Sequence, residues 1–193
     1  MLLRELALLT EHLEHVKEIV ATQQSYAKVS GVVQEVALST LVDDACRMVQ
    51  PALAQHNVVV ERDFEEMPPI LADKHRTLQI LLNLLRNAND AVKSSAPPDR
   101  VIHVRIKRQA HDRVRLEVHD KGIGLPNENL TRIFAHGFTT KEGGHGFGLH
   151  SGALAAKQMG GSLWAESAGL GRGATFTLEL PLQVNSAIQK TAA

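Results

Sequence analysis

The spacing of apolar residues separates an N-terminal helical segment from a longer region of mixed pattern. Over residues 2–30 no proline or glycine occurs, and apolar positions are mostly four and three residues apart. This heptad spacing is typical of a helix that packs along a partner helix, and an amphipathic core helix is the alternative. The segment is long for a helix lying on its own domain, which favours an intermolecular bundle. The heptad positions are Leu2, Leu6, Leu9, Leu13, Val16, Val20, Gln23 and Ala27.

After Gly31 the pattern alternates between helical and extended periods. Ser39 is the predicted N-cap of one helix, and Asp73 of a second. The predicted helices are 39–55, 73–94, a short piece at 127–134 and 148–159. The predicted extended segments are 35–38, 58–64, 101–108, 114–120, 162–166 and 174–180, with a turn at 67–69. This order predicts an α/β fold, a two-layer α/β sandwich whose mixed sheet carries helices on one face.

Three segments follow from this pattern. We expect a dimerisation helix over 1–31, a catalytic domain over 32–183 and a flexible tail over 184–193. Basic and acidic residues balance at 21 each, so nothing in the charge predicts a nucleic-acid partner or membrane contact. The single cysteine, Cys46, and the lack of a signal-peptide pattern favour a cytoplasmic location. A membrane-anchored parent chain remains compatible with these observations.

Glycine is concentrated in one third of the chain. Thirteen of the fourteen glycines lie between Gly122 and Gly173, in three separate motifs. The motifs are 120–124 at the end of a strand, 143–148 at the start of a helix, and 169–173 before the last strand. Glycine at this density indicates tight turns or close approach of the backbone to a ligand.

Polar residues follow one face of the helix predicted over 73–94. Asn83, Asn87 and Asp90 are spaced i, i+4, i+7 and therefore lie on the same side. A solvated stripe is one interpretation, although asparagine is a poor helix former. A metal site is the other, because amide oxygens suit Mg²⁺, which completes its shell with phosphate and water.

Asp120 and the glycines after it indicate a nucleotide. Asp120 shares a strand face with Val114, Leu116 and Val118, so its carboxylate points toward the core and needs a donor. An exocyclic amino group such as that of adenine would supply one, whereas an ordinary turn aspartate is the alternative.

Gly146 and Gly148 open a helix, where free N–H groups favour phosphate. Thr139, Thr140 and Lys141 precede them and could add hydroxyl groups and a cation. A glycine-rich helix entry is a weak signal when taken alone.

Taken together, five motifs in this order resemble the ATP-binding domain of sensor histidine kinases, in the superfamily with the Bergerat fold. They are Asn83-x₃-Asn87, Asp120-x-Gly-x-Gly124, Phe134-x₃-Phe138, Gly144-x-Gly-x-Gly148 and Gly171-x-Gly-Ala-Thr-Phe176. DNA gyrase, a heat-shock chaperone and mismatch-repair ATPases share this superfamily. The resemblance covers residues 35–182.

The resemblance implies ATP and Mg²⁺ as cofactors. Asn87 would hold Mg²⁺, Asp120 would bind the adenine amino group, and residues 125–147 would form an ATP lid anchored by Phe134 and Phe138. Asn83, Asn87 and Lys141 are the implied catalytic residues. The other implied nucleotide contacts are Asp90, Gly122, Gly124, Phe138, Thr140, Gly144, His145, Gly146, Phe147, Gly148, Leu149 and Thr175.

The chain departs from the family pattern at two positions. Ala174 stands where many members carry threonine, so Thr175 is a candidate for the water-mediated adenine contact. Asp90 stands where lysine is common, which puts a phosphate contact from that residue in doubt. The lid histidines His136, His145 and His150 are either phosphate neighbours or incidental surface residues.

Position 83 favours a kinase over a hydrolase. Superfamily members that hydrolyse ATP carry glutamate four residues before the metal-binding asparagine, and here that residue is Asn83. An amide cannot accept a proton from water at neutral pH. We therefore expect transfer of the γ-phosphoryl group to a protein nucleophile.

The expected acceptor is a histidine on an upstream helix, outside this sequence. His12 and His15 do not match the family's acceptor motif, and the heptad helix resembles the second helix of a dimerisation hairpin. The expected partners are a second copy of the chain, the upstream helix and a response-regulator receiver domain. A serine kinase of the anti-sigma-factor type and a non-catalytic nucleotide-binding module are the alternatives.

Overall fold

The computed structural model describes residues 31–95, 100–141, 144 and 146–183. The chain divides into two units, Met1–Val32 and Val33–Ala193, and the elements below belong to the second. The helix predicted over 2–30 and the tail over 184–193 lie outside the described residues. The helices are α2 Leu38–Gln55, α3 Lys74–Ser95, α4 Asn129–Arg132 and α5 Gly148–Gln158. The strands are β1 Val33–Val36, β2 Val59–Phe64, β3 Ile70–Asp73, β4 Val101–Gln109, β5 Arg113–Asp120, β6 Ser162–Glu166 and β7 Ala174–Pro181.

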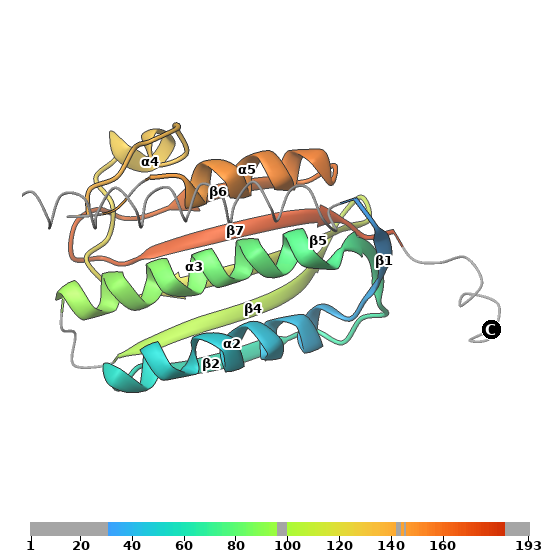
Figure 1. Cartoon of the computed structure of the whole chain (residues 1–193), viewed down its shortest axis with the longest axis horizontal. Helices are drawn as coiled ribbons and strands as arrows, with labels where there is room; N and C mark the ends of the chain where they lie inside the picture. Colours follow the sequence, from blue (N-terminus) through green and yellow to red (C-terminus); the bar gives the residue numbers. More distant parts are fainter. Residues whose placement is uncertain (1–30, 96–99, 142–143, 145, 184–193) are drawn as a thin grey trace, which may run out of the picture. The chain divides into compact units, whose positions relative to one another are not determined.

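Five of these strands form one mixed sheet in the order β2-β4-β5-β7-β6. Strand β2 runs parallel to β4, and the other neighbours are antiparallel. Helices α2, α3 and α5 lie side by side over the sheet, with α3 in the middle (Figure 1). The predicted two-layer α/β sandwich with a mixed sheet is confirmed.

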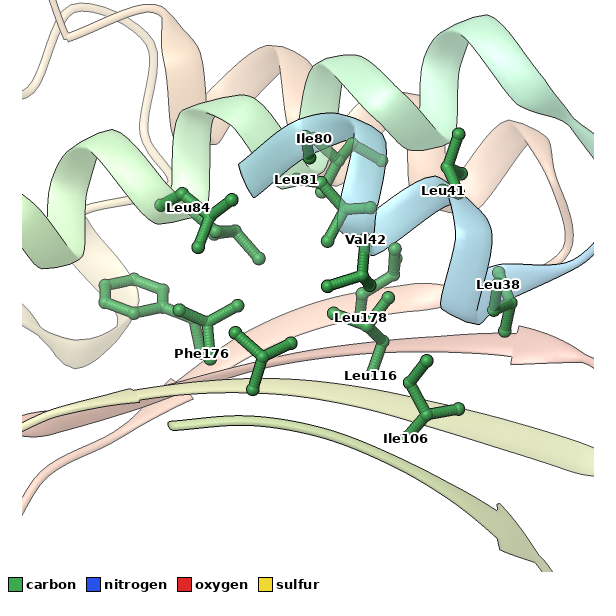
Figure 2. Close-up of a cluster of buried hydrophobic side chains, with 14 of the residues drawn as sticks. Leu38, Leu41, Val42, Ile80, Leu81, Leu84, Ile106, Leu116, Phe176 and Leu178 are labelled. Carbon is green, nitrogen blue, oxygen red and sulfur yellow. The ribbon is translucent and has the colours of Figure 1, made fainter. Parts of the chain in front are cut away.

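The core lies between these two layers. Leu81 and Leu84 of α3 point at the sheet, where Leu116 of β5 and Leu178 of β7 face them (Figure 2). All four side chains are buried, at 2% exposure or less. Truncating one such leucine to alanine costs about 2–5 kcal/mol, so this layer fixes the position of α3 above β5.

A short strand was missed by the sequence pattern. Residues 70–73 form β3, which pairs antiparallel with β1 in a separate two-stranded sheet. Four residues are too few for a recognisable alternation, and three of them are buried, which removes the polar positions of the pattern.

The two predicted helix caps had different outcomes. Asp73 caps α3 as predicted, because its Oδ1 accepts a hydrogen bond from the Arg76 backbone N–H at 3.0 Å. Ser39 is not the N-cap of α2, so that prediction is wrong. The helix begins at Leu38, after Ala37, and no side chain caps it. Leu38 is 3% exposed, and its burial just after β1 accompanies an N-cap position, Ala37, two residues before the predicted one.

Candidate functional site

Three segments distant in sequence meet at one end of the domain. They are the end of β5, the second half of α3 and the start of α5 (Figure 1). Antiparallel pairing of β5 with β7 also brings the end of β5 next to the start of β7. Each glycine motif of the sequence adjoins one of these ends.

Asp120 is the buried acid of this site. It is 1% exposed, and its Oδ1 accepts a hydrogen bond from the Gly122 backbone N–H at 2.8 Å. Its Oδ2 is buried and has no hydrogen-bond partner among the described residues. Burial raises the pKa of Asp120 to about 6, and the backbone N–H groups of Gly122 and Ala174 oppose this rise. Such an acceptor requires a donor from a ligand or water.

The glycines after Asp120 allow backbone segments to touch. A Cβ at Gly122 would lie 2.4 Å from the backbone carbon of Ala91 in α3. A Cβ at Gly124 would lie 2.1 Å from the Gly169 carbonyl oxygen. The structure therefore gives both glycines a packing role, and their contact with a base remains a prediction.

Asn83 of α3 lies beneath the first residue of α5. A Cβ at Gly148 would be 2.3 Å from Asn83 Oδ1, so any larger residue there would displace this side-chain amide. Asn83 Nδ2 is buried without a hydrogen-bond partner among the described residues. The amide is thus a second unsatisfied group at this end of the domain, here a donor rather than an acceptor.

Lys141 joins the lid to α3. Its Nζ donates to Asn87 Oδ1 at 2.8 Å and to Asp90 Oδ2 at 2.6 Å. The structure thus brings Lys141 together with two predicted site residues that lie more than fifty positions earlier in the sequence. Asn87 Oδ1 therefore accepts a hydrogen bond from a cationic donor.

The described part of the predicted lid contacts the core through its aromatic residues. Phe134 and Phe138 pack against the buried core, as expected from the resemblance, and Arg132 lies 4.8 Å above the Phe138 ring. Leu149 also packs against the core, so it supports the site from below. Phe147 touches the His136 ring at a centroid distance of 4.8 Å.

The lid backbone turns at Lys141. Its backbone N–H donates to Thr139 Oγ1 at 3.1 Å, and its carbonyl oxygen accepts from Gly144 at 3.1 Å. A Cβ at Gly146 would lie 2.5 Å from the Phe138 carbonyl oxygen. Thr140 is exposed. His145 lies outside the described residues, so its phosphate contact stays a prediction.

Thr175 does not belong to this site, which corrects the expectation that it contacts the base. Its Oγ1 lies 3.0 Å from His119 Nδ1, on the face of the sheet opposite Asp120. Successive side chains of a strand point to opposite faces, so Thr175 cannot replace the threonine hydroxyl missing at Ala174.

The comparison with protein-family models gives the deciding observation. Residues 72–184 match the model described as histidine kinase-, DNA gyrase B- and HSP90-like ATPase. The chain belongs to this ATPase family. The match begins at the end of β3 and includes every site residue named above.

Curated relatives of this ATPase domain are sensor kinases. The chain is 31% identical over 170 residues to the sensor protein FixL of Bradyrhizobium diazoefficiens, which covers 88% of the chain and 32% of FixL. It is 35% identical over 152 residues to the sensor histidine kinase ZraS of Klebsiella oxytoca, covering 77% of the chain and 31% of ZraS. The chain thus spans about a third of the length of these two relatives.

Solved structures agree with the fold. Full-length ShkA in complex with AMPPNP superposes with a TM-score of 0.77 at 25% identity, covering 91% of this chain and 37% of ShkA. The catalytic domain of the histidine kinase ThkA gives a TM-score of 0.68 at 25% identity, covering 79% of this chain and 97% of ThkA.

Two polar residues at this end of the domain were not singled out as site residues by the sequence analysis. Ser167 Oγ accepts from the Leu125 backbone N–H at 3.0 Å and donates to the Gly173 carbonyl oxygen at 2.6 Å. A serine two residues before Gly169 is a turn signal that could have found it. Asn89 is 6% exposed, and its buried Oδ1 has no hydrogen-bond partner in the part of the chain that the structure describes; only its low helix propensity could have drawn attention to it.

The described residues include neither a membrane-spanning helix nor a cluster of metal-ligating side chains. No described helix is long and apolar enough to cross a membrane. No three histidine, cysteine, aspartate or glutamate side chains of the described part converge on a common metal position. A metal bound through Asn87 would therefore need oxygen ligands from the nucleotide and from water, which is the usual coordination of Mg²⁺.

Proposed function

We propose that this domain binds ATP with Mg²⁺ and transfers the γ-phosphoryl group to a histidine of its own sensor kinase. Asp120 supports the adenine part of the proposal. Its unpartnered Oδ2 would accept a hydrogen bond from the exocyclic amine, while Oδ1 keeps its bond to Gly122. The AMPPNP complex of the similar protein ShkA agrees with an ATP ligand.

Asn87, Lys141 and the start of α5 support the phosphate part. Lys141 places a cation beside Asn87 Oδ1, and α5 begins with N–H groups that face the same end of the domain. Mg²⁺ bound at Asn87 would neutralise the charge that develops on the transferred phosphoryl group. Lys141 is long enough to follow the phosphates as a mobile donor.

The residue at position 83 is the reason for proposing a kinase rather than a hydrolase. The residue packed beneath Gly148 is an amide, and an amide has no basic site that could deprotonate water near neutral pH. The bound ATP would therefore react with a stronger nucleophile than water. A neutral imidazole is such a nucleophile at physiological pH.

The partners follow from the relatives. FixL and ZraS are named as a sensor protein and a sensor histidine kinase. By this similarity we propose a cytoplasmic, homodimeric parent kinase, with dimerisation through residues 1–31. An upstream helix would carry the acceptor histidine, and a receiver domain would take the phosphoryl group onward.

Incubation of the chain with γ-labelled ATP and Mg²⁺ tests the proposal, with and without the upstream segment of its parent protein. We expect acid-labile, base-stable label on the added segment and little release of inorganic phosphate. Acid-stable label on a serine would favour a serine kinase instead. Rapid release of inorganic phosphate without any labelled protein would contradict transfer to a protein.

A further inference from the structure

The lid lysine makes an unusual pair of contacts for a surface residue. Asn87 and Asp90 are three residues apart on α3, so they lie on one face one turn apart. A single ammonium group, that of Lys141, bridges both of them, at 2.8 Å and 2.6 Å. Lys141 has three N–H donors, and two of them are used here.

These contacts place the lysine in competition with the metal. Asn87 Oδ1 is the oxygen proposed to bind Mg²⁺, and it accepts the ammonium group instead. Two cations at one oxygen repel each other, so binding of the metal at Asn87 weakens the contact of this oxygen with Lys141. Arrival of a metal–nucleotide complex would therefore favour movement of Lys141 away from Asn87.

The carboxylate of Asp90 supplies most of the attraction in this cluster. Asn87 is neutral, so a charge-assisted hydrogen bond forms only between Lys141 and Asp90. Asp90 stands at a position from which a phosphate contact is implausible, since a carboxylate repels phosphate. The geometry gives it a different task.

We propose that Asp90 is a positioning residue that holds Lys141 over the metal ligand Asn87 and releases it when the metal–nucleotide complex binds. This proposal rests on the proposed function, because it assigns the metal to Asn87. The released ammonium group then becomes available to the anionic phosphates. Binding of metal, binding of phosphate and movement of the lid residue are thereby coupled through one side chain.

The strength of the contact suits such an exchange. The side chains of Lys141 and Asp90 are 43% and 49% exposed, and exposed ion pairs contribute only about 0.2–1 kcal/mol. A contact of this size positions a side chain without trapping it. Its loss should change populations by a factor of about two to five.

Hydrogen exchange of residues 135–141 in the protein without nucleotide tests the positioning directly. In Asp90→Asn we expect these amides to exchange about two to five times faster than in the wild type. Asp90→Glu should restore most of the protection. Asp63→Asn is the matched control, since Asp63 is also an exposed acid that pairs with cations, Arg105 at 3.7 Å and Lys107 at 3.8 Å. Unchanged exchange in Asp90→Asn would overturn the proposal.

Binding of AMPPNP, measured by calorimetry with Mg²⁺ and with EDTA, tests the coupling. In EDTA we expect Asp90→Asn to bind about two to five times more tightly, because Lys141 is free to meet the phosphates. In a Lys141→Met background the same substitution should change this affinity much less. Equal tightening in both backgrounds would mean simple charge repulsion by Asp90 and would overturn the coupling.

The same data distinguish a failure of the role proposed for Asp90 from a failure of the proposed function. If Asp90 were a direct metal ligand, Asp90→Asn would weaken binding only with Mg²⁺ and leave the exchange unchanged, which overturns the positioning role. If the wild type bound no nucleotide under either condition, the proposed function would fail. Faster exchange in Asp90→Asn would then show that Asp90 holds Lys141 without any coupling to a nucleotide.

Discussion

The two ends of the candidate site are built differently. Around Asp120 the contacts join backbone to backbone, and the acid itself is 1% exposed. Around Asn87 the contacts join side chains, and the lysine that makes them is 43% exposed. The base end therefore belongs to the folded core, whereas the phosphate end is held by one long side chain.

This difference separates two kinds of substitution. A change at the base end that disturbs backbone packing should reduce the stability of the whole domain. A change at the phosphate end should alter ligand binding while the fold stays intact, since exposed side-chain contacts contribute little to the free energy of unfolding. The predictions below test this separation.

The largest expected effect is on stability, from Gly173→Ala. A Cβ there would lie 2.0 Å from the Asp120 carbonyl oxygen, and Gly173 has a φ of +68°. We expect a loss of about 3 kcal/mol or more in the free energy of unfolding, measured by urea denaturation. Gly171→Ala is the matched control, because its φ is +73° with open space around it. It should cost about 1 kcal/mol, and equal losses would mean that the close contact is unimportant.

The next effect is on binding, from Asp120→Asn. The asparagine oxygen can keep the hydrogen bond from Gly122, so the fold should persist. The amide nitrogen would face the adenine amine with a second donor, which leaves both unsatisfied. We expect calorimetry to show an affinity for AMPPNP lower by about 10- to 100-fold. An affinity within twofold of the wild type would remove Asp120 from the site.

Gly148→Ala should separate binding from stability at the phosphate end. Its Cβ would meet the side-chain amide of Asn83, which can move, and alanine favours a helix more than glycine does. The free energy of unfolding should change by less than about 1 kcal/mol, while affinity for Mg·AMPPNP falls about tenfold as Asn83 is displaced. A large loss of stability with unchanged affinity would show that Gly148 serves the fold and not nucleotide binding.

The smallest expected effect is a pH dependence of stability at the base end. Burial raises the pKa of Asp120 from 3.8 to about 6, so this carboxyl group stays protonated to a higher pH in the folded domain than in the unfolded chain. The contribution of Asp120 to stability must therefore decrease as pH rises through this interval. Between about pH 5 and about pH 7, the unfolding free energy of the wild type relative to Asp120→Asn should fall by about 1 kcal/mol. A rise over the same interval would contradict the burial of an unpaired carboxylate.

The sequence predicted the long helices and strands of the fold better than its short strands and helix ends. Long segments gave α3, β4, β5 and β7 nearly to the residue, because α3 has a clear helical period of apolar residues and the strands have several alternating buried positions. The strand β3 and the start of α2 were missed or misplaced, since both depend on burial at a junction rather than on a repeating pattern.

For the site, the sequence predicted which residues gather but not what they contact. Asn87, Asp90 and Lys141 do meet, yet a sequence pattern carries no sign that the lysine bridges the other two. Thr175 was misplaced because it neighbours the position of the missing threonine hydroxyl, but alternation along β7 turns its side chain toward His119. Contacts across the sheet and lid are tertiary facts, and only the structure gives them.

The central claim is that Asp120 selects an adenine nucleotide through its unpartnered Oδ2. Calorimetry with Mg·AMPPNP and Mg·GMPPNP, on the wild type and on Asp120→Asn, tests it most directly. We predict clear binding of the adenine analogue and none of the guanine analogue, whose carbonyl oxygen would face the carboxylate, and loss of this preference in Asp120→Asn. Equal binding of both analogues by the wild type would contradict the claim.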